Sequence, residues 1–166
     1  MAQRDSRTTE LTLTRTMAAK AADIFDRWLD AKKPGSPWFG TKKAIVDPVV
    51  DGLFYHAVHF EGHDWAHYGR FIALERGRRI EHTWVSEATR GLESVVTLTL
   101  EPQGAKTLVT LHHSGIPDDE MGHRHRDGWG YCLDALTRKQ ERAGCGAGSL
   151  PVSLSSIIPA RRTCAG

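Results

Sequence analysis

The stretch "LVTLHHSGIPDDEMGHRHRDGWGYCLDAL", residues 108–136, joins two kinds of periodicity. Its first part alternates between apolar and polar residues, which predicts a β-strand that ends near Gly115. The acidic residues 118–120 suit the positive end of a helix macrodipole. From Met121 to Leu136, apolar residues recur at spacings of three and four. The chain is therefore predicted to pass here from a strand into a long amphipathic helix.

Upstream, the chain consists mainly of short strand-like segments separated by turn signals rich in Gly, Asp and Pro. One helix is predicted within residues 17–30, after a strand at 11–15. The remaining strands are predicted at 44–48, 53–60, 65–75, 79–86, 92–101 and 106–113. This order predicts an α+β domain in which helix covers one face of an antiparallel sheet. Since a strongly twisted sheet curls, space for small apolar ligands is expected between the layers.

The length of 166 residues suits one domain, which we expect at 10–142, after a short extension at 1–9. Residues 143–166 are rich in Gly, Ser and Pro and are predicted to be a loosely ordered tail. The three cysteines lack the spacing of a zinc site or a disulfide framework. Cys132 falls on the apolar stripe of the long helix and is expected to be a small buried hydrophobe, whereas Cys145 and Cys164 lie in the tail.

The charge balance argues against two classes of partner. A formal net charge of only +2 gives no strong field toward nucleic acid or an anionic membrane. The first ten residues lack the apolar segment of a secretory signal, and no run of about 18 apolar residues occurs. We therefore expect a cytoplasmic protein that neither binds nucleic acid nor inserts into a membrane.

Seven short motifs carry a family resemblance. They are "LTLTRTMAAKAADIFDRW" (11–28), "PWFG" (37–40), "DGLF" (51–54), "GRFIAL" (69–74), "RIEHTW" (79–84), "LVTLHHSGIP" (108–117) and "HRDGWGYCLDAL" (125–136). In this order the sequence resembles the START-related, Bet v allergen-like superfamily called SRPBCC, and within it the branch of the activator of heat-shock protein 90 ATPase. The resemblance implies a helix-grip fold, a curved sheet of about six to seven strands around a long C-terminal helix, with a hydrophobic cavity. One departure is Asp51-Gly52, where the family usually has two glycines.

Residues 59–71, "HFEGHDWAHYGRF", predict a histidine-rich hairpin. A four-residue turn at 61–64 would pair Val58 with His67. His56 and His67 would then face the interior as diagonal neighbours, while the other histidines of the hairpin are solvated.

Alternation along the other strands assigns further inward faces, which mix aromatic, aliphatic and histidine side chains. With the aromatic loop at 37–40 and the apolar stripe of the long helix, they give a candidate ligand-binding set. Its members are Trp38, Phe39, Phe54, His56, Val58, Trp65, His67, Phe71, His82, Trp84, Val96, Leu98, Val109, Leu111, His113, His125, Trp129 and Cys132. The large aromatics are equally the natural core of a small α+β domain.

Neither a metal site nor a catalytic centre is predicted. A zinc site needs three or four ligands that converge at about 2 Å, whereas the hairpin histidines scatter over two faces and a tip. We therefore expect no metal and no cofactor. Ser94 or Cys132, with His113 and Asp118, supplies the residue types of nucleophilic catalysis without an organising motif. Interior histidines could still act as acid, base or orienting donor, or simply bond buried backbone and water.

Three functions remain open. The leading hypothesis is a cofactor-free helix-grip domain that binds a small hydrophobic molecule between the long helix and the sheet. The alternative is a chaperone-cofactor-like domain with a protein partner or a second copy as a homodimer, which an exposed apolar patch would favour. The third is a cyclase- or hydrolase-type enzyme that uses interior histidines.

Overall fold

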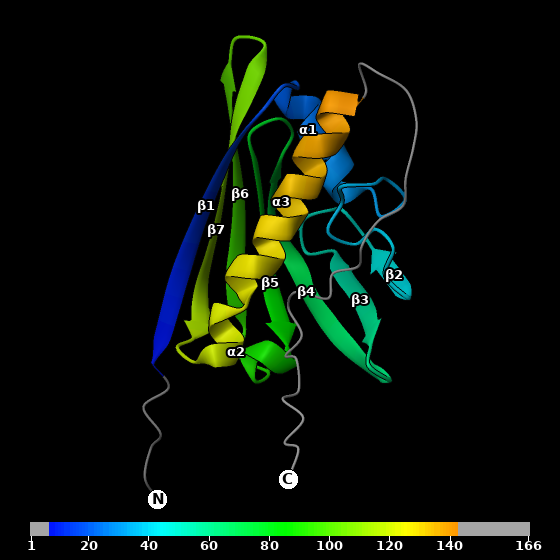
Figure 1. Ribbon diagram of the computed structural model, residues 1–166, viewed down its shortest axis with the longest axis vertical. Coiled ribbons are helices and arrows are strands. Elements are labelled where there is room, and N and C mark those ends of the chain that lie inside the picture. The colour runs from blue at the N-terminus through cyan, green and yellow to red at the C-terminus, as the bar shows by residue number, and fades with distance from the viewer. Residues whose placement is uncertain (1–6, 143–166) are drawn as a thin grey trace, which may run out of the picture.

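A seven-stranded antiparallel sheet, in the order β1-β7-β6-β5-β4-β3-β2, forms the frame of the molecule (Figure 1). The computed structural model describes residues 7–142. The strands are β1 (Thr8–Met17), β2 (Lys43–Val46), β3 (Leu53–Phe60), β4 (His63–Glu75), β5 (Arg79–Ser86), β6 (Ser94–Gln103) and β7 (Lys106–Pro117). The helices are α1 (Ala21–Leu29), α2 (Glu120–His123) and α3 (His125–Arg142), with a single 3-10 turn η1 (Glu87–Thr89). The predicted α+β helix-grip fold is confirmed, and the predicted tail at 143–166 lies outside the described residues.

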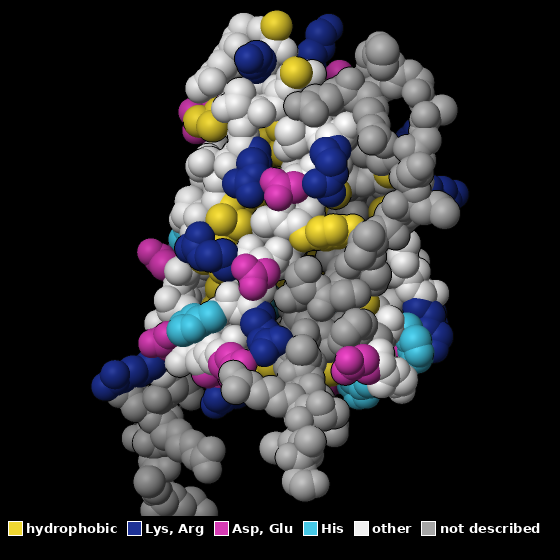
Figure 2. Space-filling view, viewed as in Figure 1, with side chains coloured by type: hydrophobic (Ala, Val, Ile, Leu, Met, Phe, Trp, Pro, Cys, Tyr) yellow, Lys and Arg dark blue, Asp and Glu magenta, His cyan; other side chains and the backbone are white. Residues whose placement is uncertain are grey.

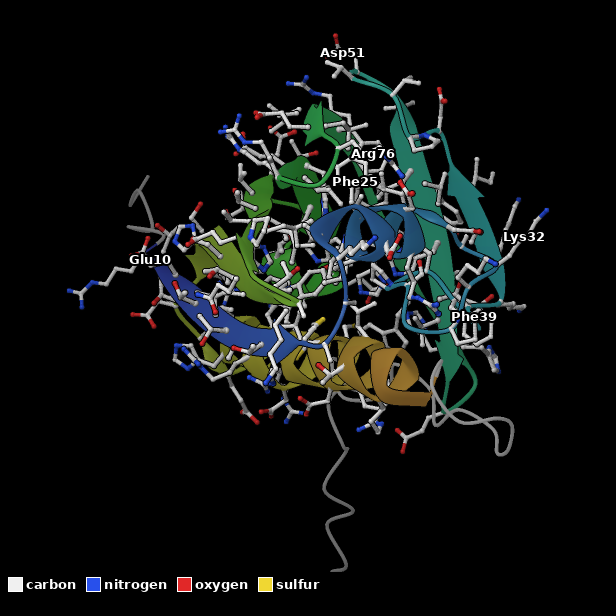
Figure 3. All side chains as sticks on the ribbon, turned by 90° about the horizontal axis from the view of Figure 1, so that it is seen from above. Glu10, Phe25, Lys32, Phe39, Asp51 and Arg76 are labelled. Atoms are coloured by element: carbon white, nitrogen blue, oxygen red, sulfur yellow. The ribbon has the colours of Figure 1, made fainter. Side chains whose placement is uncertain are left out.

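The sheet is strongly curved, and α3 crosses its open side. Seen from above, the strands curl from β1 round to β3 and β2, with α1 at one end of the enclosed space (Figure 3). The inner side of α3 is apolar, because Trp129, Cys132, Leu133 and Leu136 are all buried. The face that carries α3 shows basic and acidic side chains intermixed (Figure 2), without a field of one sign. None of the described helices is long and apolar enough to cross a membrane.

The long C-terminal helix does not begin where the sequence predicts. It is divided into α2 and α3 at Arg124, so the prediction of a single helix from Met121 is wrong. The Asp119 side chain caps α2 by accepting a hydrogen bond of 2.7 Å from the Gly122 backbone N–H. Gly122 lies so close to strand β7 that a Cβ there would be 1.8 Å from the Pro117 carbonyl oxygen. This close approach turns the chain before the main helix starts.

The β3–β4 hairpin has a tighter turn than predicted. Only Glu61 and Gly62 form the turn, and both have positive φ angles, 49° and 77°, as a two-residue type I′ turn requires. Val58 therefore pairs with Trp65, and His56 lies directly opposite His67. The predicted pairing of Val58 with His67 is wrong by two residues, but a shift of two leaves every side chain on its predicted face.

The bend before β3 has Asp51 at the first position of the pair and glycine only at the second. Asp51 adopts the left-handed conformation with a φ of 65°, which aspartate tolerates better than most residues. Gly52 has no room for a side chain, since a Cβ would be 2.2 Å from the Asp47 carbonyl oxygen. The glycine that this bend requires by packing is therefore the one that the chain retains.

Candidate functional site

Rings from distant parts of the chain lie between α3 and the sheet. We call them the ring cluster, and each member is at most 3% exposed. The members are Trp28, Trp38, Phe54, His56, His67, Phe71, His82, Trp84, His113, His125 and Trp129. Trp84 lies near its centre, with its ring centroid 4.9 Å from that of Trp129 on α3 and 5.0 Å from that of His67 on β4. The sheet, both long helices and one loop thus meet in a single aromatic interior.

Trp38 reaches this interior from the loop between α1 and β2. The Ser36 hydroxyl donates to the Trp28 carbonyl oxygen at 3.0 Å and accepts from the Trp38 backbone N–H at 3.4 Å. The Thr41 hydroxyl donates to the Trp38 carbonyl oxygen at 2.9 Å. These local bonds hold the Trp38 ring 6.1 Å from that of His82. The loop therefore contributes a fully buried wall although it has no regular secondary structure.

His56 and His67 form a stacked pair. Their ring centroids are 4.7 Å apart and their planes differ by 9°. The Nδ1 atoms of both rings are buried and have no hydrogen-bond partner among the described residues. Burial lowers the pKa of His56 well below its usual range and lowers the pKa of His67 to about 4. Both rings are therefore neutral at physiological pH.

His82 and His125 share one pattern of hydrogen bonding. In each ring Nδ1 lies 2.9 Å from a backbone carbonyl oxygen, that of Thr83 for His82 and that of Gly122 for His125. A carbonyl oxygen only accepts, so Nδ1 carries the proton and Nε2 holds a free lone pair. Both Nε2 atoms are buried without a partner among the described residues. Burial lowers the pKa of His82 to about 4 and also lowers that of His125, so this neutral tautomer persists.

His113 belongs to a chain of hydrogen bonds that ties α3 to three strands. The Trp129 indole N–H donates to Nδ1 of His113 at 3.0 Å, so the imidazole proton sits on Nε2. Nε2 donates to the Ser94 hydroxyl at 2.8 Å, and that hydroxyl donates to the Trp84 carbonyl oxygen at 2.8 Å. Burial lowers the pKa of His113 well below its usual range, which keeps the ring neutral. We call this series the His113 relay.

The direction of the His113 relay opposes nucleophilic catalysis. His113 offers Ser94 a proton rather than a lone pair, so it does not act as the base that would activate the hydroxyl. Burial raises the pKa of the Cys132 thiol to about 12, which keeps that group protonated. Asp118 lies on the surface, where its carboxylate is 2.7 Å from Nε2 of His123. The structure does not assemble these residues into a catalytic group.

Buried nitrogen atoms without partners distinguish this interior from an ordinary core. The described residues contain eight such atoms: Nε1 of Trp28, Trp38, Trp65 and Trp84, Nδ1 of His56 and His67, and Nε2 of His82 and His125. Buried polar groups are normally hydrogen-bonded, and each one left unpaired costs about 1–3 kcal/mol. Seven of the eight belong to the ring cluster. The interior thus carries hydrogen-bonding capacity that the fold itself does not use.

Two members of the candidate set lie outside the buried core. Phe39 is half-buried and lies at the edge of the molecule (Figure 3). Trp65 is half-buried near the hairpin tip, with its ring centroid 4.6 Å from that of His63. The other sixteen residues of the set are buried. Alternation along the segment predicted as a strand at 92–101 also places Leu92 on the inward face. This prediction is wrong, because Leu92 precedes β6 and is 41% exposed.

Trp28 is a member of the ring cluster that the candidate set lacks. Its helical spacing with Ile24 and Phe25 predicts a buried position, but nothing local distinguishes it from other core residues. Its stacking on Trp129, at 6.2 Å between ring centroids, arises only when α1 and α3 meet. Among the described residues no group of three His, Cys, Asp or Glu side chains is arranged to hold a metal ion.

Comparisons with solved structures place the fold among known proteins. A protein from Chromobacterium violaceum matches with a TM-score of 0.67 and 23% identity, over 80% of this chain and 98% of that one. An HSP90 activator from Plasmodium falciparum matches with a TM-score of 0.60 and 22% identity, over 72% and 86%. The Aha1 dimer from Colwellia psychrerythraea matches with a TM-score of 0.61 and 17% identity, over 83% and 99%. At these identities the likeness concerns the fold alone.

No curated protein matches the chain. A family model does match, over residues 18–139, which include all of α1, every strand from β2 to β7 and most of α3. The chain therefore belongs to the family described as activator of Hsp90 ATPase homolog 1-like protein, the branch of the SRPBCC superfamily that its motifs resemble.

Proposed function

We propose that the domain at residues 10–142 binds a small, largely apolar molecule against the ring cluster, between α3 and the concave side of the sheet. The observation that carries this proposal is the set of unpartnered buried nitrogens. A core selected only for stability would satisfy or replace such groups, because each costs about 1–3 kcal/mol. A ligand that supplies hydrogen-bond partners recovers that free energy on binding.

The walls of the interior favour an apolar ligand. Phe54 and Phe71 lie 5.1 Å and 5.9 Å from the His82 ring, measured between centroids, so aromatic surface surrounds the polar atoms. Ligand sites are typically lined by apolar and aromatic side chains with a few polar groups that fix orientation. The ring cluster has this composition.

Native mass spectrometry of freshly purified protein tests the proposal. We expect a carried molecule of small mass, which extraction identifies, or saturable uptake of the probe N-phenyl-1-naphthylamine after extraction. Binding should quench the fluorescence of the buried indoles, since four tryptophans belong to the ring cluster. A matched control is the surface variant His123→Gln, which should bind equally well. The proposal would be contradicted if the purified protein carried no small molecule and also showed no saturable binding of the probe.

A second candidate function is the docking of a protein on the outer face of the sheet, at the edge formed by β2. Ile45, Tyr55 and Tyr68 lie side by side across β2, β3 and β4, and Ile45 and Tyr68 are 55% and 50% exposed. Leu53, also on β3, is 65% exposed. Two structural relatives are named as an HSP90 activator and as a dimer, which fits such a role. Ile45→Lys should weaken self-association or Hsp90 capture in sedimentation and pull-down experiments; an unchanged result in both would remove this candidate.

A further inference from the structure

We infer that the ligand of the ring cluster is an uncharged molecule with a hydroxyl group on an aromatic frame. The inference rests on the proposed function and names the chemical class of the ligand. It follows from which of the unpartnered atoms are donors and which are acceptors.

The unpartnered indoles require an acceptor. An indole N–H only donates, and those of Trp28, Trp38 and Trp84 are buried without a partner among the described residues. Trp129 provides the contrast, because His113 accepts its N–H within the ring cluster. A ligand that satisfies the remaining indoles presents oxygen or nitrogen lone pairs to them.

His82 requires a donor at the same place. Its Nδ1–H is committed to the Thr83 carbonyl oxygen, so the unpartnered Nε2 accepts. The His82 ring centroid is 6.1 Å from that of Trp38 and 6.1 Å from that of Trp84. The two rings that carry these donors thus both lie close to the ring that carries the acceptor. A hydroxyl group matches both kinds, since its proton goes to Nε2 while its oxygen accepts from an indole.

Charged ligands fit this set of atoms poorly. The buried residues of the described chain include no Lys, Arg, Asp or Glu that could neutralise a ligand charge. A carboxylate would place lone pairs against that of His82 Nε2, and an ammonium group would place its protons against the indole N–H groups. A ketone or ether would satisfy an indole but leave His82 unpaired. Phe54 and Phe71, close to His82, favour an aromatic frame.

Four naphthalene probes separate these cases by isothermal titration at about pH 7.5, where the interior histidines are neutral. They are 2-naphthol, 2-methoxynaphthalene, naphthalene and 2-naphthoate. We expect 2-naphthol to bind about tenfold more tightly than 2-methoxynaphthalene, the effect of one additional hydrogen bond. We expect 2-naphthoate to bind most weakly.

The variant His82→Phe keeps an aromatic ring at this position and removes the Nε2 acceptor, together with the Nδ1–H bond to the Thr83 carbonyl oxygen. It should reduce 2-naphthol affinity by about tenfold and change 2-methoxynaphthalene affinity by less than about twofold. His123→Gln is the matched surface control and should change neither. A measurement on the unaltered protein guards against misfolding of the variant: the ¹⁵N shift of His82 Nε2 should move when 2-naphthol binds and stay in place with 2-methoxynaphthalene.

The outcomes separate the two proposals. Equal binding of 2-naphthol and 2-methoxynaphthalene, or tightest binding of 2-naphthoate, overturns the hydroxyl inference and leaves the proposed function in place. The purified protein could also carry a molecule although none of the probes binds. A carried molecule that is charged or has no hydroxyl group overturns the inference, whereas a neutral aromatic alcohol supports it. If no probe binds and nothing is carried, the proposed function itself fails.

Discussion

The nine histidines of this chain divide into two groups that differ in burial and in the groups they contact. Four lie on the surface and each contacts a carboxylate: His59 with Asp64, His63 with Glu87, His112 with Glu10 and His123 with Asp118. The five in the ring cluster instead contact rings, backbone carbonyl oxygens or the Ser94 hydroxyl. His112 and His113 are adjacent in sequence and fall into different groups, because alternate residues of a strand point to opposite faces. Position on the strand, more than residue type, decides whether a histidine is an exposed ionic partner or a neutral interior group.

The largest expected effect of this difference is on stability at low pH. His67 and His82 have a pKa of about 4 in the folded protein against an ordinary value of 6.5, so the unfolded chain takes up protons more readily between these values. The free energy of unfolding should therefore be highest above about pH 6.5 and fall as the pH drops toward 4. Each of the two groups accounts for up to about 3 kcal/mol. Urea denaturation at a series of pH values measures this loss.

The variant His82→Phe sharpens the pH experiment. It removes one interior titrating group, so the free energy of unfolding should fall less steeply with pH than in the unaltered protein. His123→Gln, which removes an exposed histidine, is the control. Equal slopes in all three proteins would contradict the assignment of the pH dependence to the interior.

An intermediate effect is expected when the His113 relay is cut. His113→Phe leaves the buried Trp129 N–H without an acceptor and should lower the free energy of unfolding by about 2 kcal/mol. His56→Phe is the matched comparison, because Nδ1 of His56 has no partner to lose, and it should cost less than about 1 kcal/mol. Combined with Trp129→Phe in a double-mutant cycle, His113→Phe should show a coupling of about 1 kcal/mol. Additivity of the two substitutions would argue against the hydrogen bond.

The smallest effect is expected at the surface. The side chains of His123 and Asp118 are 61% and 44% exposed, so water and salt screen their attraction. His123→Gln should change the free energy of unfolding by less than about 0.5 kcal/mol at neutral pH. Thermal denaturation followed by circular dichroism measures it. A loss comparable to that of His113→Phe would remove the distinction between the two groups of histidines.

Strand alternation is enough to predict most of the interior. It places His56, His67, His82 and His113 on the inward faces because the period of two holds wherever one face is buried. It does not predict the hairpin register, since nothing in the turn sequence "EGHD" marks Glu61 as a residue with positive φ. The fold class follows from the order of elements and from the ordered motifs.

The unpartnered nitrogens and the His113 relay are not predictable in this way. Whether the indole of Trp129 meets Nδ1 of His113 depends on how α3 settles on β7, a contact between elements that strand periodicity does not describe. The same holds for Trp28, whose role depends on the meeting of two helices. Sequence patterns predict which side chains are buried, whereas hydrogen-bond partners depend on tertiary packing.

The His113 relay also sets the angle at which α3 rests on the sheet. A helix turns by about 100° per residue, so a slip of one residue along α3 would swing the Trp129 N–H away from His113. Apolar side chains alone tolerate such slips, because hydrophobic contact is non-directional. The hydrogen bond from Trp129 to His113 is directional, and it continues through Ser94 to the Trp84 carbonyl oxygen. It therefore favours a single rotation of α3 about its own axis over the interior.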